Sequence, residues 1–266
     1  MAQILFSLFV VTSVILTAQC EDVQEGWRNG YDHFWPYAVS IQYSPDGSKY
    51  DHVCTGSIIK TKYILTSASC FDKLSNDGKV AVNVGVKEHH DEKGQFINVQ
   101  NVLLHPSYNK EDPLKKFDIA LLELTDPIEF MRTVQAIKLP EKVLPPNEIG
   151  ELVGWNGLTS KTQKTVTDKI YIASVKITSR NDCRKTYPDL TDDQFCIGGV
   201  NTLEAPCKGT PGIPYGQATE DGWTIAGLAS IWPETCDRPA LFTTVSSYLD
   251  FILEALNNNT EEDYDY

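Results

Sequence analysis

The sequence predicts an all-β fold with one α-helix at its C-terminal end, and three observations lead to this prediction. Apolar residues alternate with other residues at period two, most clearly over residues 80–86. Turn-forming residues separate such segments, for example Ser44-Pro45-Asp46-Gly47-Ser48. Helical spacing of apolar residues is concentrated at residues 245–256. Many short strands joined by turns are typical of β-barrels or β-sandwiches.

The strand pattern begins after Pro36 and continues through most of the chain. Expected strands lie at residues 37–43, 53–59, 63–66, 80–86, 96–104, 119–124, 150–155, 169–177 and 223–231. The stretch at 21–35 is polar and charged, and we expect it to be irregular. The C-terminal helix should end near Leu256, because three consecutive asparagines follow it.

Composition limits the classes of partner. The chain has 266 residues and a net charge of -13, which argues against nucleic acid and anionic membranes as partners. Residues 1–20 hold an uncharged, mostly apolar run that is typical of a secretory signal peptide, with cleavage after Ala18 or after Cys20. We therefore expect a secreted, extracellular and soluble protein.

The cysteine count fits a secreted protein. The chain has seven cysteines, and cleavage after Cys20 would leave six, an even number that indicates a disulfide framework. Six cysteines allow fifteen pairings, so spacing alone does not choose among them. The spacing does not suggest a zinc site, and we expect no metal and no cofactor.

The histidines do not suggest a metal site either. The run His89-His90-Asp91-Glu92 could hold a metal ion, but adjacent residues on a strand point to opposite sides. We therefore interpret this run as a solvated loop between strands.

Three short segments carry recognisable motifs. The stretch 207–214 reads Cys-Lys-Gly-Thr-Pro-Gly-Ile-Pro, the stretch 65–70 reads Leu-Thr-Ser-Ala-Ser-Cys, and the stretch 117–122 reads Phe-Asp-Ile-Ala-Leu-Leu. In this order, they resemble the nucleophile loop, the segment of the catalytic base and the segment of the orienting carboxylate in chymotrypsin-like (trypsin-family) serine proteases.

The resemblance implies two six-stranded antiparallel β-barrels with a C-terminal α-helix, formed by residues 21–256. The proline-rich break at 126–149 would be the linker between the barrels. It also implies three disulfides between cysteines that follow one another in the chain: Cys54–Cys70, Cys183–Cys196 and Cys207–Cys236.

The sequence departs from the family pattern at the residues that carry the chemistry. Ser69 stands where the family has its histidine base, and Pro211 stands where it has its nucleophilic serine. Proline has no nucleophile and no backbone N–H, and that N–H is one of the two donors of the oxyanion hole. Thr210 replaces the aspartate that receives the new N-terminus after activation, while Asp118, the orienting carboxylate, is kept. We therefore expect no peptidase activity.

The substrate pocket has also changed. Gly209 remains from the oxyanion loop, whereas Ala205 stands at the base of the pocket. The pocket wall reads Ile231-Trp232-Pro233, whose proline cannot donate the N–H that pairs with substrate, and Ala240 replaces a glycine that opens the pocket. We expect a narrowed or closed pocket, and no calcium site in the loop after Val84.

The resemblance and these departures predict a secreted, inactive homologue that modulates a proteolytic cascade of the complement, coagulation or melanisation type. Its partner would be a protease, cofactor or inhibitor, and the chain is expected to be a monomer. A residual serine endopeptidase and a secreted carrier or storage protein remain as alternatives.

The tail, residues 257–266, is predicted to be a disordered acidic terminus. Asn258 begins a glycosylation sequon, and Tyr264 and Tyr266 lie among carboxylates, where sulfation would add charge. The functional alternative is an acidic hook for a basic surface of a partner.

Overall fold

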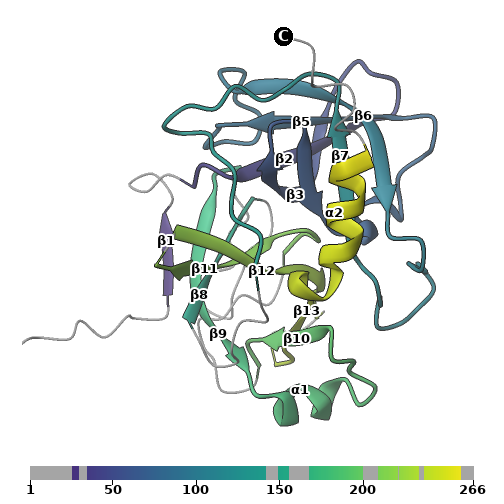
Figure 1. Cartoon of the computed structure of the whole chain (residues 1–266), viewed down its shortest axis with the longest axis vertical. Coiled ribbons are helices and arrows are strands. Elements are labelled where there is room, and N and C mark those ends of the chain that lie inside the picture. Colours follow the sequence, from purple (N-terminus) through teal and green to yellow (C-terminus); the bar gives the residue numbers. More distant parts are fainter. Residues whose placement is uncertain are drawn as a thin grey trace, which may run out of the picture.

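The chain forms two antiparallel β-barrels that pack against each other, and helix α2 runs alongside both (Figure 1). This computed structural model describes residues 26–29, 35–141, 149–155, 168–199, 209–220, 222–233 and 237–258. The predicted fold class, two six-stranded barrels with a C-terminal helix, is confirmed.

The first barrel closes in the order β2-β3-β4-β7-β6-β5. Its strands are β2 (Ala38–Ser44), β3 (Asp51–Lys60), β4 (Tyr63–Thr66), β5 (Lys79–Val84), β6 (Gln95–Leu104) and β7 (Ala120–Leu124). The closing pair, β2 with β5, keeps one register from Val39↔Val84 to Ser44↔Lys79. The apolar residues of the alternating pattern face inward, so that Ile41, Ile64 and Val82 are fully buried.

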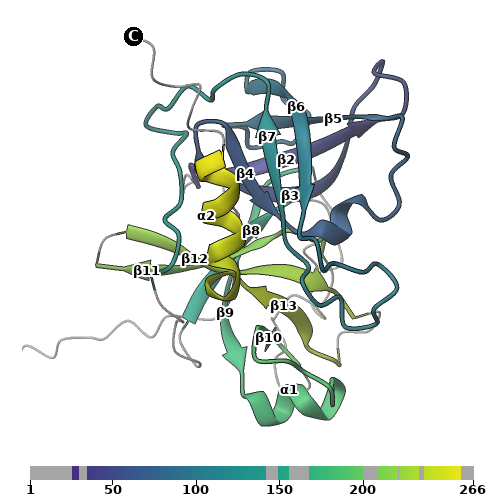
Figure 2. The same ribbon diagram turned by 45° about the vertical axis from the view of Figure 1, so that its right-hand side comes forward.

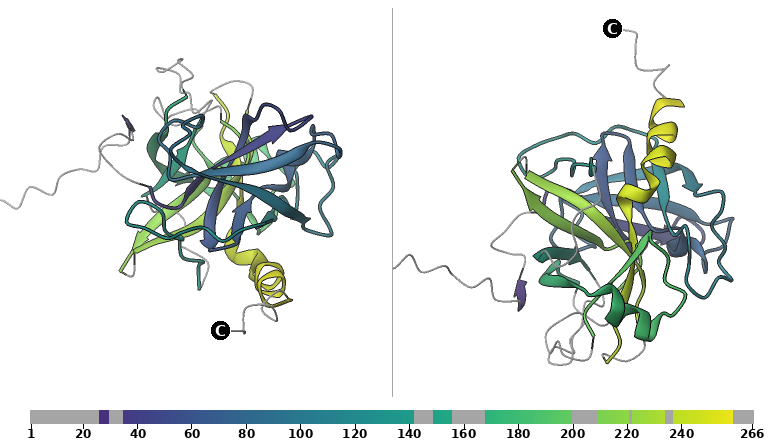
Figure 3. Two further views of the ribbon diagram at one scale, coloured as in Figure 1. Left: turned by 90° about the horizontal axis from the view of Figure 1, so that it is seen from above. Right: turned by 60° about the horizontal axis from the view of Figure 1, so that its bottom comes forward.

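The second barrel closes in the order β8-β9-β10-β13-β12-β11. Its strands are β8 (Ile149–Gly154), β9 (Tyr171–Thr178), β10 (Gln194–Ile197), β11 (Pro214–Thr219), β12 (Gly222–Ile231) and β13 (Ala240–Thr244). A further strand, β1 (Gly26–Asn29), pairs with β9 and lies at the outer edge of this barrel (Figure 3).

The helices are short and lie outside the barrels. The 3-10 turn η1 (Ala68–Phe71) follows β4, and α1 (Arg180–Thr186) follows β9. The 3-10 turn η2 (Val245–Tyr248) leads directly into α2 (Leu249–Asn258). Figure 2 shows α2 beside the junction of the two barrels. Its apolar stripe is buried there with residues of both barrels, in a cluster that includes Leu65, Leu121, Trp155, Leu228, Ile252 and Leu256.

Two expectations about local structure are wrong. The stretch 21–35, expected to be irregular, contains β1, because backbone pairing with the free edge of β9 outweighs its polar composition. The helix expected to end near Leu256 continues to Asn258, a difference of two residues at a helix end.

Two of the three expected disulfides are present. Cys54–Cys70 joins β3 to η1, and Cys183–Cys196 joins α1 to β10. Cys207 and Cys236 lie outside the described residues, as do residues 1–20, which are expected to be a signal peptide, and residues 259–266 of the tail. Among the described residues, no helix has the length and apolar character that crossing a membrane requires.

Candidate functional site

The three segments that resemble catalytic motifs converge where the barrels meet. Ser69 lies in η1, Asp118 lies two residues before the start of β7, and Pro211 lies in the loop before β11. The Pro211 carbonyl accepts a hydrogen bond of 3.4 Å from the Thr55 N–H in the first barrel. The next residue, Gly212, donates its N–H to the Ala229 carbonyl of the second barrel at 2.8 Å. The loop is thereby attached to both barrels.

Asp118 is fully buried and accepts three hydrogen bonds. The Ser69 N–H donates to Oδ1 at 2.7 Å, and the Ser69 hydroxyl donates to Oδ2 at 2.7 Å. The third donor is the hydroxyl of Ser230, from β12, which also binds Oδ2. The carboxylate that would orient a base is therefore bound by two serines.

The electrostatics of Asp118 follow from its burial. Desolvation raises the pKa of Asp118 above its ordinary value, because the charged form has lost its water. Hydrogen bonds from Ser230 and Ser69 oppose this rise, and the negative charge of Asp72 adds to it.

The backbone before Asp118 has an unusual conformation. Phe117 has φ of 59°, in the left-handed region that bulky residues rarely adopt. Its ring stacks on His105, with ring centroids 5.0 Å apart. This conformation immediately precedes the buried carboxylate and helps to set the direction of its side chain.

The loop that carries Pro211 is tightly packed. Gly212 has φ of +79°, and a Cβ at this position would lie 2.2 Å from both the Thr55 carbonyl oxygen and Thr66 Oγ1. Only glycine both tolerates this left-handed φ and fits where there is no room for a Cβ. This explains why this glycine remains although the nucleophile position holds proline.

The expected pocket region contains Trp232 against the loop. The Trp232 indole N–H donates to the Thr210 carbonyl at 3.0 Å, and a Cβ on Gly209 would lie 2.5 Å from the indole ring. Pro233 and Ala240 are buried, and Ile231 is partly buried. Ala205 lies outside the described residues. The closed pocket remains a prediction, although the indole does lie directly against the loop backbone.

The described histidines make their contacts away from Ser69. His52 Nδ1 lies 2.9 Å from Ser40 Oγ, and burial lowers the pKa of His52 to about 3. Burial also lowers the pKa of His105, whose ring packs among aromatic side chains. His89 and His90 both face Asp168. His33 lies outside the described residues.

Sequence reasoning missed one residue of this site. Ser230 donates to Asp118 from 112 residues away, and nothing in the local pattern of β12 announces this contact. The available signal was its place in the mostly apolar expected strand at 223–231, because a serine that becomes buried in such a strand usually has a hydrogen-bond partner.

Comparison with known proteins agrees with this fold. The chain matches the Trypsin family over residues 25–252, and it belongs to this family of serine proteases. It is similar to Trypsin-4 of Rattus norvegicus, with 29% identity over 261 residues that cover 96% of this chain and 98% of the relative. It is also similar to Chymotrypsin-C of Mus musculus, with 28% identity over 246 residues, or 87% and 88% of the two chains. Chymotrypsin-like elastase family member 1 of Homo sapiens is 27% identical over 232 residues, or 85% and 89%.

Proposed function

We propose that this chain is a secreted, catalytically inactive member of the trypsin family that binds a protein of a proteolytic cascade and modulates it. The observation that carries the proposal is the pairing of Ser69 with Asp118. In a catalytic triad a carboxylate orients a base that accepts a proton. Here the residue bound to the carboxylate is a serine, whose hydroxyl does not accept protons near neutral pH.

The nucleophile position supports the same proposal. Pro211 offers no attacking atom and no N–H for an oxyanion. In serine proteases, loss of one triad member costs ~10⁴- to 10⁶-fold in turnover, and loss of one oxyanion donor costs ~10²- to 10³-fold. These factors do not multiply simply, but each alone would reduce turnover to a trace.

Secretion is supported by two independent features. Residues 1–20 have the composition of a signal peptide. The disulfides Cys54–Cys70 and Cys183–Cys196 are of a kind that persists in oxidising, extracellular environments.

Two alternatives are weaker. A residual endopeptidase is favoured by the relatives, which are named as a trypsin, a chymotrypsin and an elastase. A carrier would need a ligand cavity, and an apolar recess of about 200 Å³ does lie beside α1, lined by Ile177, Cys183, Leu190, Phe195 and Ala226. This volume is below the ~300–1,000 Å³ of common ligand sites. A second recess of about 480 Å³ falls within that range, but polar residues such as Lys79, Asn98 and Gln100 contribute much of its lining, which does not suit an apolar cargo.

Catalytic inactivity is tested with the purified mature chain, a mixed library of fluorogenic peptides and a serine-directed fluorophosphonate. The expected result is no hydrolysis above background and no labelling, with an active trypsin as positive control. Stoichiometric labelling would overturn the proposal and favour the residual endopeptidase.

Binding is tested by immobilising the mature chain and adding purified trypsin-family proteases, their cofactors and their protein inhibitors. We expect at least one to bind and the measured proteolytic rate to change. If none of the three classes binds, the modulator role is wrong.

The tail gives this binding test a second measurement. Deletion of residues 261–266 removes four acidic side chains and should slow association more than it speeds dissociation. The difference should shrink above ~0.15 M salt, where charges are screened beyond about 8 Å. An unchanged association rate at low salt would exclude a role for the tail in binding.

A further inference from the structure

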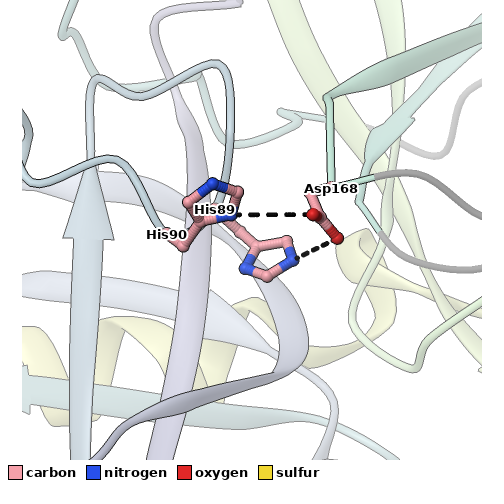
Figure 4. Close-up of side chains that lie close together, drawn as sticks. All are labelled: His89, His90 and Asp168. Atoms are coloured by element: carbon pink, nitrogen blue, oxygen red, sulfur yellow. Dashed lines mark hydrogen bonds and ion pairs between the residues drawn. The ribbon is translucent and has the colours of Figure 1, made fainter.

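His89, His90 and Asp168 lie together at the surface where the barrels meet (Figure 4). His89 Nε2 lies 3.3 Å from Asp168 Oδ1, and His90 Nδ1 lies 3.8 Å from Asp168 Oδ2. Each residue offers one potential ligand atom, and these three atoms lie within 4.8 Å of one another. The two imidazoles come from the first barrel, whereas the carboxylate lies just before β9 of the second.

The backbone fixes this arrangement. The His89 N–H donates to the Asp168 carbonyl at 3.1 Å, and the Ile170 N–H donates to the Lys87 carbonyl at 2.8 Å. Glu88 and Lys169 form an antiparallel β-bridge between these two bonds. The loop after β5 and the start of β9 are thus joined by main-chain pairing, and the spacing of the three side chains is set before any ligand arrives.

The His89 ring is also supported from behind. It stacks on His52, with ring centroids 5.1 Å apart and an angle of 29° between the planes. The Gln42 side-chain amide donates to the His89 carbonyl at 2.6 Å. The His89 side chain is only 14% exposed, so its ring is held in one orientation with Nε2 directed at Asp168.

The expectation that this run holds no metal rested on adjacent strand residues pointing apart. His89 and His90 instead form a turn after the bridge residue Glu88, and both rings face the same carboxylate. The run does lie between strands, β5 and β6, as expected, but His89 is not solvated.

We propose that His89, His90 and Asp168 form a binding site for a divalent transition metal ion of the Zn²⁺ class. Tetrahedral Zn²⁺ binds nitrogen and oxygen at ~2.0–2.2 Å, which places neighbouring ligand atoms about 3.3 Å apart. The observed separations of 3.3 and 3.8 Å run to the two different oxygens of Asp168, and the three ligand atoms lie within 4.8 Å of one another. The side chains would therefore close by up to about 1.5 Å around an ion. Three protein ligands leave a fourth position open to water or to a group of a partner.

Glu88 supplies the orienting carboxylate of this site. Its Oε2 lies 3.5 Å from His90 Nε2, the ring nitrogen that faces away from Asp168. A metal-bound histidine commonly donates its other N–H to a carboxylate, which fixes the ring and raises its basicity as a ligand. Glu88 therefore holds the His90 ring with Nδ1 toward the ion.

The donor set selects the metal. Ca²⁺ takes six to eight oxygen ligands and Mg²⁺ demands oxygen in octahedral geometry, so two imidazoles suit neither ion. Imidazole suits Zn²⁺, Cu²⁺ and Ni²⁺. The bound ion would connect the two barrels and would stabilise the folded chain by mass action.

The proposal is tested by titrating chelator-treated, dialysed mature protein with ZnCl₂ in a calorimeter. We expect one saturable Zn²⁺ per chain, no displacement by millimolar CaCl₂, and a Zn²⁺-dependent rise in the unfolding midpoint. Saturable binding that CaCl₂ displaces, or no saturable binding, would overturn the proposal.

Matched variants locate the ion. His90→Ala and Asp168→Asn should each weaken Zn²⁺ affinity at least ~10- to 100-fold, the loss seen even for residues that only orient ligands. Glu92→Gln removes one negative charge from an exposed residue of the same loop and should leave the affinity unchanged. Affinities equal to the wild type in both ligand variants would overturn the proposal.

A measurement on the unmodified protein covers the case in which a variant misfolds. The ring nitrogen resonances of ¹⁵N-labelled protein should shift on addition of ZnCl₂ at Nε2 of His89 and Nδ1 of His90. Shifts confined to His33 or His105 would place the ion elsewhere and overturn the assignment.

Discussion

Ser69 donates to both carboxylate oxygens of Asp118, from its backbone N–H to Oδ1 and from its hydroxyl to Oδ2, each at 2.7 Å. The short side chain of Ser69 thus satisfies a buried carboxylate, at the position that the proposed function assigns to a lost catalytic base. Because a buried carboxylate without donors is costly, this pair should contribute to the stability of the fold.

Ser69→Ala removes one of the three hydrogen bonds to Asp118 and keeps the backbone bond. We expect the free energy of unfolding to fall by about 1–3 kcal/mol, the cost of removing a donor from a buried acceptor. Urea denaturation of the oxidised protein measures this change.

Ser57→Ala is the matched control. Ser57 is fully buried in β3, and its hydroxyl has no hydrogen-bond partner among the described residues. Its removal should be close to neutral, because no bond is lost. Equal losses in the two variants would mean that the Ser69 hydroxyl contributes nothing through Asp118.

The raised pKa of Asp118 predicts that the stability of the folded chain depends on pH. Its pKa is raised in the folded chain, so its contribution to stability is fully present below the unfolded pKa, ~3.9. That contribution is lost as the pH rises through the folded pKa. Asp118→Asn removes the titration, and the stability of wild type relative to this variant should therefore decline as the pH rises above ~4. Urea midpoints of both proteins across this range provide the test, and a relative stability that increases with pH would contradict the prediction.

The strands with clear alternation could be predicted from the sequence, and those defined by long-range pairing could not. Residues 80–86 were expected as a strand from their alternating valines, and β5 spans Lys79–Val84. In contrast, β11 begins with a proline and contains Gly216, which local rules treat as unfavourable in strands. It forms because β8 and β12 pair with it on both sides. β13 is buried at four consecutive residues and shows no alternation.

The same distinction applies to the candidate sites. The resemblance to catalytic motifs identified Ser69, Asp118 and Pro211, because each lies within a short contiguous sequence pattern. The bond from Ser230 to Asp118 spans 112 residues, and the contact of His89 with Asp168 spans 79. Contacts of this separation depend on how the two barrels pack, which no local pattern in one sequence specifies.

Pro211→Ser should not create a peptidase. The change supplies a hydroxyl and restores the backbone N–H, but Ser69 still cannot accept the proton that a nucleophile must release. We expect fluorophosphonate labelling no greater than that of Pro211→Ala, which makes the same backbone change without the hydroxyl. Stoichiometric labelling of the serine variant alone would show that another group acts as the base.

The remaining disulfide, Cys207–Cys236, can be tested by peptide mapping. Digestion without reduction should release it together with the two observed pairs, Cys54–Cys70 and Cys183–Cys196, which serve as internal controls. Replacing Cys207 and Cys236 by Ala should cost about 2–4 kcal/mol. Recovery of either residue as a free thiol, or joined to Cys20, would contradict the pairing.

Gly212→Ala tests how tightly the former nucleophile loop is held between the barrels. The residue has φ of +79°, and an added Cβ would meet the Thr55 carbonyl and Thr66 Oγ1 at 2.2 Å. A left-handed conformation costs a non-glycine residue roughly 1–2 kcal/mol, and an overpacked site costs about 1–3 kcal/mol more. Gly222→Ala separates these contributions, since Gly222 has φ of +113° and open space around the same atom. We expect both variants to lower the free energy of unfolding in urea, with the larger loss for Gly212→Ala. Equal losses would show that the Thr55 carbonyl and the Thr66 side chain move aside readily, and the loop would then not be held rigidly between the barrels.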